Sequence, residues 1–324
     1  MRIDNACRNI YAGQKINFNT FKGRSRTADS LCRDTFERKE NKSFAAFLQQ
    51  INTLYPFKKP EEILAAAVKE ENAAGSGCWS DVYFIPEAPD YVLKVNHNIK
   101  PFEIAKYKMQ QIPDEFPFDN FGQKIADNGR GAYILKKADG VMLGFKNPGE
   151  PGRPNAEDAQ LVLAQIKSIS QFPIESYINL ASDLKKINQS KTYRIDFSNA
   201  NNMLIDYAKK EFNIVDLTEK SEMKELKNIS HDVNDMISLL VNVCFHGSVY
   251  EKLPSNEEKE ELKKYSKMVI NKCREAAKAA GLNNSGETAV QKFEKMNDYC
   301  RRVFGADCFF VPRYENFRKL YEEV

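Results

Sequence analysis

The sequence predicts an α+β protein in which a small antiparallel sheet is followed by a helical part. Between residues 73 and 138, short runs rich in β-branched and aromatic residues alternate with glycine and proline turn signals. The run FKNPGEPGRP at residues 145–154 has the composition of a linker, with three prolines and two glycines. Beyond it, apolar residues recur mainly at helical spacing. The order is therefore sheet, linker and helices.

Two short helices are expected before the sheet. Residues 1–42 show no sustained hydrophobic period and are expected to be irregular. Ser43 can cap a helix that Pro56 ends, and Pro60 suits the first turn of a second helix through EEILAAAVKEEN at 61–72. The apolar positions of the first helix fall on one face: Phe44, Phe47, Leu48 and Ile51.

The strands of the sheet are expected in four stretches of sequence. AGSGCWSDVYFIP at 74–86 is typical of strand, glycine turn and strand, and YVLKVN at 91–96 of a third strand. FGQKIADNG and GAYILKKA indicate two further strands joined at Asn128-Gly129, a strong hairpin signal. A helix over residues 100–111, stopped by Pro113, is inserted before this hairpin.

The second half is expected to be helical, with one strand pair. Asn155 can cap a helix through Gln171, and a second helix runs from Pro173 to Asn188. The strand pair NMLID and FNIVDL follows at 202–217, and helices fill the chain from Ser230, one of them closed by Gly281. We therefore expect a basic, largely irregular segment with a short helix at 1–58, a sheet-bearing unit at 59–145 and a helical unit with a C-terminal extension at 146–324.

Composition excludes several classes of protein. The 324 residues are 42% hydrophobic and 29% charged, unlike collagen-like, disulfide-scaffold or wholly disordered chains. The net charge of +3 gives no reason to expect a nucleic acid partner, although residues 1–60 hold twelve Lys/Arg against five Asp/Glu, as in a solvated tail or a docking segment. Seven cysteines without a CxxC pair favour reduced thiols, and no apolar run suits a transmembrane segment or a Sec signal peptide.

Two features of the sheet-bearing unit suit phosphate chemistry. Gly75, Ser76 and Gly77 lie between two strand signals, where glycines let the backbone approach a phosphate closely. Lys94 lies mid-strand among apolar residues, where its charge needs a partner. Taken singly, the first feature is more often a hairpin turn and the second a lysine on the solvent face of an edge strand.

Two further features lie in the helical unit. Asp196, in YRIDFSNAN, is followed five positions later by Asn201, and Asp216 follows an apolar strand. Carboxylate and amide oxygens are hard ligands suited to Mg²⁺, and another carboxylate could accept a hydroxyl proton. Taken singly, each aspartate is more often a cap or a turn residue.

The order of these features resembles the protein-kinase-like superfamily. GSGCWSDV is similar to the G-x-G-x-x-G-x-V loop with Ser80 in place of the third glycine, and YVLKV resembles the strand of the phosphate-binding lysine. YRIDFSNAN resembles the catalytic loop, and IVDL stands where D-F-G is expected. The resemblance covers roughly residues 70–245. It implies a two-lobed protein-kinase-like fold, with a small antiparallel sheet lobe and a helical lobe, that uses ATP and Mg²⁺.

The resemblance implies a role for each matching residue. Asp196 would accept the proton of the substrate hydroxyl, while Lys94 would hold the α- and β-phosphates and be oriented by Glu103. Asn201 and Asp216 would bind Mg²⁺. Leu135 would lie behind the adenine, and residues 136–138 would form the hinge between the lobes. The nucleotide would thus contact Gly75, Ser76, Gly77, Val82, Lys94, Leu135, Lys136 and Ala138.

Several positions depart from the family pattern. Arg194-Ile195-Asp196 stands at the H-R-D position, Asp216-Leu217-Thr218 lacks the glycine, and no A-P-E follows. Asn202 directly follows Asn201 and would be the ligand if the loop held one extra residue. This abbreviated pattern resembles effector kinases that bacteria deliver into host cells. The resemblance therefore implies a cytoplasmic location, or secretion into a host cell without a Sec signal.

The expected function is a Ser/Thr protein kinase that acts on a protein substrate. A small-molecule kinase of the aminoglycoside or choline type is an alternative, but the helical unit shows no obvious acidic cluster for a cationic substrate. A catalytically silent kinase-like binding module is the other alternative. Asp232 is expected to cap a helix or anchor a loop, and His97, His231 and His246 are expected to be ordinary surface or core residues because they lack metal-ligand spacing.

Overall fold

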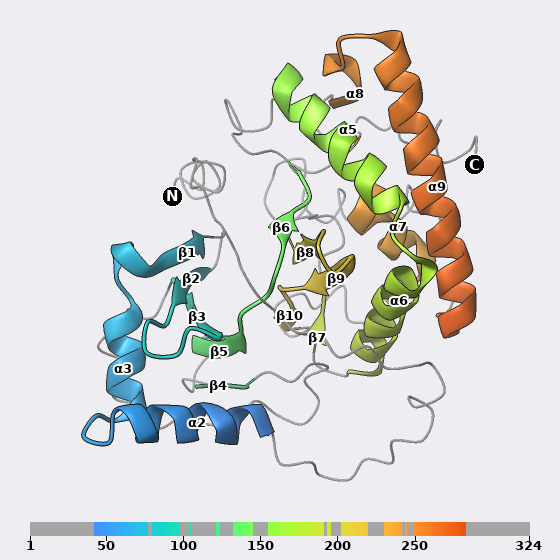
Figure 1. Cartoon of the computed structure of the whole chain (residues 1–324). Coiled ribbons are helices and arrows are strands. Elements are labelled where there is room, and N and C mark those ends of the chain that lie inside the picture. Colours follow the sequence, from blue (N-terminus) through green and yellow to red (C-terminus); the bar gives the residue numbers. More distant parts are fainter. Residues whose placement is uncertain are drawn as a thin grey trace, which may run out of the picture.

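The structure, a computed structural model, describes residues 42–76, 80–97, 104, 121–123, 132–144, 155–190, 193–195, 202–219, 230–241, 244 and 249–282. Two regions lie side by side, a sheet with two helices in blue to green and a mainly helical region in green to orange (Figure 1). Each region has its own cluster of buried apolar side chains. The chain is therefore an α+β protein, as the sequence predicts.

The five-stranded sheet is antiparallel at every pairing and has the strand order β1-β2-β3-β5-β4. All the strands predicted before residue 139 are present. The glycine turn at 77–79 and the Asn128-Gly129 turn lie outside the described residues, as does the expected helix at 100–111 except Ile104, which is helical and fully buried. The strands are β1 (Ala73–Ser76), β2 (Ser80–Phe84), β3 (Tyr91–Asn96), β4 (Phe121–Gln123) and β5 (Ala132–Lys136).

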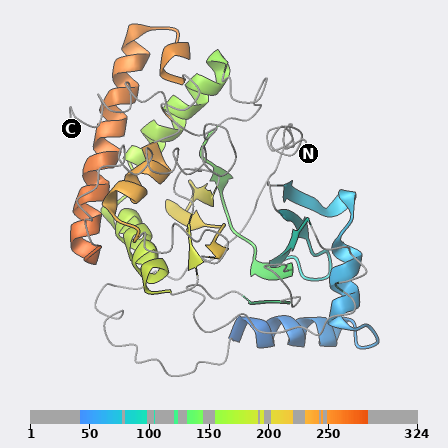
Figure 2. The ribbon, with the colours of Figure 1, turned by 180° about the vertical axis from the view of Figure 1, so that it is seen from behind.

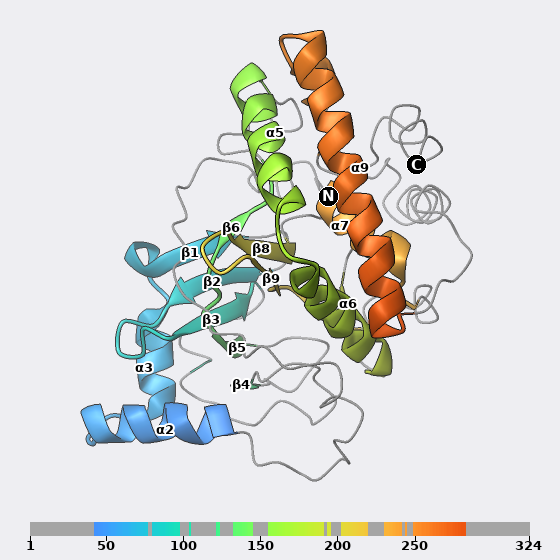
Figure 3. The ribbon, with the colours of Figure 1, turned by 45° about the vertical axis from the view of Figure 1, so that its right-hand side comes forward.

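One face of this sheet packs against α2 (Lys42–Leu54) and α3 (Pro60–Ala67). Figure 3 shows α2 running beneath the sheet and α3 standing beside it. The ring of Phe47 on α2 meets the edge of the Tyr91 ring on β3, with 5.2 Å between their centroids. We call this cluster the N-terminal core, and its fully buried members include Phe47, Ile51, Ile63, Leu64, Leu93, Ala132 and Ile134.

The ends of both helices differ from the sequence prediction. Helix α2 begins at Lys42, so Ser43 lies inside it and is not its cap. Helix α3 has Pro60 in its first turn as predicted, but it ends at Ala67, and Glu70–Asn72 forms a separate 3₁₀ turn. The Asn72 side chain donates to the Ala67 carbonyl at 3.0 Å, which satisfies one of the acceptors at the helix end. The predicted continuation through residue 72 is therefore wrong.

The helical region is built around α9, which packs against α5, α6 and α7 (Figures 1 and 2). Asn155 caps α5 as predicted, since its Oδ1 accepts from the Asp158 N–H at 2.8 Å. Gly281 closes α9 in the left-handed conformation, also as predicted. No described helix is long and apolar enough to cross a membrane. The helices are α5 (Ala156–Ser170), α6 (Ile174–Gln189), α7 (Val233–Val241), α8 (Val249–Lys252) and α9 (Asn256–Ala280).

Two small sheets lie between the five-stranded sheet and these helices (Figures 1 and 3). One has the order β6-β8-β9, from Val141–Met142, Met203–Asp206 and Glu211–Ile214, and the other pairs β7 (Tyr193–Arg194) with β10 (Thr218–Glu219). The β8–β9 hairpin is the predicted strand pair. Strands β6, β7 and β10 have two residues each and are too short to give a sequence period. The Phe212 ring of β9 packs on Tyr177 of α6, with centroids 5.1 Å apart, which fixes the hairpin to the helical region.

Candidate functional site

Lys94 lies in a row of paired residues that crosses the sheet. Gly75 pairs with Val82, Val82 with Lys94, and Lys94 with Tyr133. Directly opposite residues of antiparallel strands place their side chains on the same face. Val82 and Lys94 therefore share a face, and opposite Val82 the glycine has no side chain. The register thus sets three of the predicted nucleotide-binding residues in one line.

This face of the sheet is not the face that forms the N-terminal core. Residues alternate between faces along β3, so Val92 and Lys94 point away from the buried Leu93 and Val95. Leu135 pairs with Val92 and belongs to the same face as Lys94. Val82, Lys94 and Leu135 are only partly buried, whereas Leu93 and Val95 on the other face are buried. The sheet therefore presents a second face on which the Lys94 ammonium lies among the apolar side chains of Val82, Val92 and Leu135.

Asp216 of the helical region forms an ion pair with Lys94, 122 residues earlier in the chain. The Nζ of Lys94 donates to Oδ1 of Asp216, and the two side chains are 18% and 43% exposed respectively. Asp216 comes two residues after the end of β9, where the Val215 N–H donates to the Asn202 carbonyl at 2.9 Å. A sheet side chain and a strand-end side chain thus meet between the two regions. The sequence order alone would not bring them together.

The β7–β10 pair brings a third segment near Asp216. Arg194 on β7 pairs with Thr218 on β10, so the chain leading to residue 196 neighbours the chain that follows Asp216. Asn202, the alternative metal ligand, is 6% exposed and lies beside Val215. The remaining predicted site residues, Gly77, Glu103, Asp196 and Asn201, lie outside the described residues.

The segment from Lys136 to Gly140 links the sheet to the helical region. The Lys137 N–H donates to the Asp90 carbonyl at 2.9 Å, which continues the β3–β5 pairing past residue 136. Ala138 is buried, at 8% exposure. Gly140 has φ +119°, and a Cβ there would lie 2.5 Å from the Ile205 carbonyl carbon. Only glycine allows this close approach to β8.

A charged cluster that we call the clasp fixes this linking segment to the β8–β9 hairpin. The Lys209 ammonium forms ion pairs with the buried carboxylates of Asp139 and, at 2.9 Å, Asp206. Asn213 donates to the Asp139 carbonyl at 3.1 Å. Burial alone would raise the pKa of Asp206, but hydrogen bonds from Lys209 and Ala208 hold that pKa below its ordinary value. Burial raises the pKa of Glu211, and the nearby Asp206 and Asp139 add to that rise.

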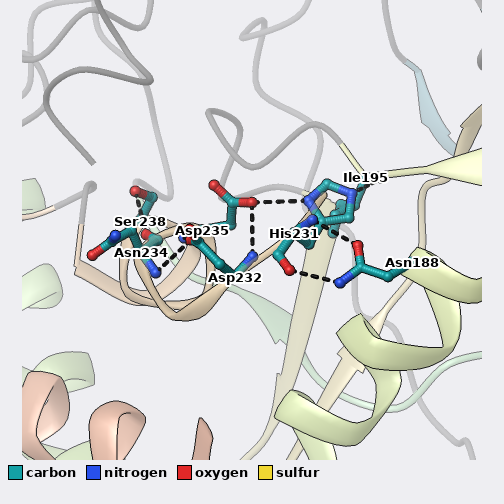
Figure 4. Close-up of polar contacts among 7 residues, drawn as sticks. All are labelled: Asn188, Ile195, His231, Asp232, Asn234, Asp235 and Ser238. Carbon is teal, nitrogen blue, oxygen red and sulfur yellow. Dashed lines mark hydrogen bonds and ion pairs between the residues drawn. The ribbon is translucent and has the colours of Figure 1, made fainter. Parts of the chain in front are cut away.

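A buried hydrogen-bond network contacts Ile195, the last described residue before Asp196 (Figure 4). The Ile195 N–H donates to Nε2 of His231 at 3.2 Å, and Nδ1 of His231 lies 3.1 Å from Oδ2 of Asp235. Asp232 caps α7 as predicted, since its Oδ1 accepts from the backbone N–H groups of Asn234 and Asp235 at 2.8 and 3.2 Å. The His231 side chain is 2% exposed and both ring nitrogens are engaged, so it has no access to a substrate.

Sequence reasoning missed the clasp and this network. Lys209 lies in an ordinary hairpin turn and Asp139 in a loop, and neither has a spacing that marks a site. His231 is four residues from Asp235, a helical spacing that aligns two side chains, but that spacing is common in helices without any function. Asp139-Gly140 was a usable turn signal.

The described residues contain no group of three or more His, Cys, Asp or Glu side chains that could hold a metal ion by themselves. No protein-family model matches the chain, and a search of curated proteins gives no significant match.

Proposed function

We propose that this chain is an ATP- and Mg²⁺-dependent phosphotransferase that transfers the γ-phosphate to a Ser/Thr hydroxyl of a protein. The observation that supports this most is the ion pair between Lys94 and Asp216. The family resemblance implies adjacent tasks for these two residues, Lys94 on the phosphates and Asp216 on the metal. Their contact across 122 residues is what such a site requires. The sheet and helical regions would then be the two lobes of a protein-kinase-like fold.

The residues present fit a nucleotide with its magnesium ion. Mg²⁺ in nucleotide sites is held by one or two carboxylates together with phosphates and waters, so it needs no cluster of protein ligands. Asp216 offers a carboxylate that is 43% exposed, beside the Lys94 ammonium group. Val82 and Leu135 on the same face offer the apolar surface on which a base would rest. When bound, Mg²⁺ neutralises the charge that develops on the phosphates.

The chain's own groups would then work by position and charge. Lys94 is ion-paired with Asp216, and in the proposed site its ammonium would hold the α- and β-phosphates while Asp216 would hold the metal. Asp196, one residue after the anchored Ile195, accepts the proton of the attacking hydroxyl. Phosphoryl transfer asks for little covalent chemistry from the protein, so accurate placement of these three groups supplies most of the catalysis.

The described part of the helical region favours a protein substrate. The surface of α9 alternates in sign, as in the pair Lys263–Glu260 at 3.0 Å and the contact of Glu261 with Lys167 at 3.6 Å. An acidic surface that would concentrate a cationic small molecule is not found on these described helices.

The test is incubation of the purified chain with γ-labelled ATP and Mg²⁺, alone, with a host-cell lysate and with a bacterial lysate. The Asp216→Ala variant is the matched control for contaminating kinases. We expect an acid-stable phosphoserine or phosphothreonine label on the chain or on a lysate protein, absent with the variant. Label found only in a small molecule would replace the protein substrate by a small-molecule one. No label in any arm would refute the transferase assignment.

A further inference from the structure

The buried network at the start of α7 sends one hydrogen bond out to the segment that precedes Asp196. His231 and Asp235 have almost no exposed surface and lie in the helical region. Figure 4 shows the imidazole of His231 between the Asp235 carboxylate on one side and Ile195 on the other. A buried polar ring in this position either serves only the packing of α7 or holds Ile195 in place.

The hydrogen bonds fix which ring nitrogen carries the proton. A backbone N–H can only donate, so Nε2 of His231, 3.2 Å from the Ile195 nitrogen, accepts with its lone pair. The proton of the neutral ring is therefore on Nδ1, which donates to Oδ2 of Asp235 at 3.1 Å. The same carboxylate oxygen also accepts from the Asp232 N–H at 3.2 Å. Asp235 thus sets the tautomer that Ile195 needs.

The backbone of His231 is held as firmly as its ring. The Asn188 side chain on α6 donates through Nδ2 to the His231 carbonyl and accepts through Oδ1 from the His231 N–H, both at 2.6 Å. On the other side, Asp232 caps the first turn of α7. His231 is therefore fixed to two helices, and its Nε2 is a rigid acceptor for a chain segment outside both of them.

We infer that His231 is a positioning residue, oriented by Asp235, that holds the backbone at Ile195, one residue before the proton acceptor of the proposed function, Asp196. This inference rests on the proposed function for the role of Asp196 and on the described hydrogen bonds for the anchor itself. The β7–β10 pairing fixes the same segment from the other side at Arg194. Ile195 is 3% exposed, so losing the imidazole acceptor would leave its N–H buried without a hydrogen-bond partner from bulk solvent.

Two substitutions of His231, by Gln and by Asn, distinguish an anchoring role from simple packing. In His231→Gln the side-chain oxygen reaches the position of Nε2 and can accept from the Ile195 N–H. In His231→Asn the amide reaches only the position of Nδ1, so it can donate to Asp235 but cannot contact Ile195. Both variants place one neutral amide in the same buried site, which makes each the control for the other.

The first measurement is hydrogen exchange of the Ile195 amide, which needs no activity. We expect exchange at least about tenfold faster in His231→Asn than in His231→Gln, with the amides of α9 unchanged in both. Equal protection in the two variants would overturn the anchor. If His231→Asn does not fold, the ¹⁵N shifts of His231 in the wild-type protein decide the question. They should show a protonated Nδ1 and an unprotonated Nε2, and a proton on Nε2 would overturn it.

The second measurement is turnover. In His231→Asn we expect kcat to fall about 10²-fold with the KM for ATP within about twofold, because Lys94, Val82 and Asp216 are untouched. His231→Gln should recover most of kcat. A wild-type kcat in His231→Asn, in an active enzyme, would remove the positioning role and leave the proposed function intact.

A different result is that the wild-type protein is inactive while His231→Asn and His231→Gln still differ in exchange at Ile195. The proposed function would fall, and the anchoring of Ile195 by His231 would stand without a catalytic role. Lys94→Ala provides the converse control, because it should stop turnover and leave exchange at Ile195 unchanged.

Discussion

The two regions hold their chemistry-bearing residues in different ways. In the five-stranded sheet, Lys94 is placed by strand register, with Val82 and Tyr133 opposite it and an apolar core on the other face. In the helical region the corresponding groups come from strand ends and loops, Asp216 after β9 and Ile195 after β7. Those loops are held by polar side chains buried within the region.

The distribution of buried polar residues reflects this difference. Among the described residues, Ser80 is the only buried polar side chain in the sheet region, whereas fourteen lie from Asp139 onward. The backbone N–H and C=O groups of a strand hydrogen-bond to the neighbouring strand, so the strand side chains can be apolar. The backbone groups of a buried loop lack such a neighbour, and side chains such as Asn188, His231 and Asp206 hydrogen-bond to them instead. The candidate site therefore joins one group fixed by register to others fixed by buried polar contacts.

The largest expected effect is on the contact that joins the two regions. If the proposed function holds, Lys94→Ala and Asp216→Ala should each lower kcat/KM by about 10³-fold or more, because each removes a charge that would act on the phosphates or the metal. Stability should change by less than about 1 kcal/mol, because the ion pair is partly exposed. Steady-state kinetics and urea unfolding measure the two quantities.

Lys263→Ala is the control, since it removes a lysine that is also ion-paired with a carboxylate but lies on α9. Turnover near the wild-type value in either site variant would remove that residue from the site.

The next effect is on the linking segment, through stability. Gly140→Ala should lower the free energy of unfolding by about 3 kcal/mol, because φ is +119° and the new Cβ would meet the Ile205 backbone at 2.5 Å. Gly281→Ala is the matched comparison. That glycine also has a positive φ, of +65°, but the nearest atom to its new Cβ is the movable Lys185 ammonium at 3.3 Å, so we expect about 1 kcal/mol. Equal losses in the two variants would show that the approach to β8 is not tight.

The clasp is expected to contribute less to the free energy of unfolding than Gly140 does, and its contribution should depend on pH. Lys209→Met should cost about 2 kcal/mol at pH 7, less than a fully buried pair, because Lys209 is 35% exposed. The lowered pKa of Asp206 means that its contribution is present above the ordinary carboxyl range and is lost as pH falls through the folded-state pKa. The hydrogen bond with Asp139 is the main cause of the raised pKa of Lys209. The contribution of Lys209 to stability is therefore lost only as pH rises through that folded-state pKa.

The difference between wild type and Lys209→Met should therefore be greatest near neutral pH and shrink in acid, as urea unfolding at a series of pH values would measure. Glu211 works in the opposite direction in both proteins, because its raised pKa means that protonation favours the folded state. A difference that stays constant down to strongly acidic pH would show that Lys209 acts through packing rather than charge.

The smallest effect is expected at the N-terminal segment. Deletion of residues 1–41 should leave kcat within about twofold, because that stretch shows no periodic core pattern. Deletion of residues 1–54 should instead destabilise the sheet region by about 3 kcal/mol or more, because it removes Phe47 and Ile51 from the N-terminal core. Thermal unfolding and kinetics of both truncations test this, and a loss of ATP turnover on removing 1–41 would make that segment part of the working enzyme.

The parts of the fold that the sequence predicted are those with a period or a local signal. The strands of the large sheet, helices α5, α6 and α9, the β8–β9 hairpin and the caps at Asn155, Asp232 and Gly281 all follow from hydrophobic spacing or from end-specific residues. The end of α3 did not follow, because it depends on a contact between Asn72 and Ala67 that no pattern specifies. Strands β6, β7 and β10 exist only through pairing with distant segments.

The same distinction applies to the candidate site, where some residues could be predicted from the sequence but their contacts could not. Lys94 and Asp216 were selected because of their order in a resemblance, and their contact is a tertiary event that hydrophobic periodicity does not encode. His231 was expected to be an ordinary histidine because a single imidazole has no spacing to reveal its partners. Its acceptor role depends on Asn188, Ile195 and Asp235, which come from three separate segments.

The most direct test of the central claim is calorimetric titration of a non-hydrolysable ATP analogue, with and without Mg²⁺, into the wild-type, Lys94→Ala and Asp216→Ala proteins. If the two regions meet around one nucleotide and its metal, Mg²⁺ should tighten binding to the wild type and should not do so in Asp216→Ala, while Lys94→Ala should bind weakly in both conditions. A wild-type protein that does not bind the analogue, or an Asp216→Ala variant with the wild-type response to Mg²⁺, would contradict the account.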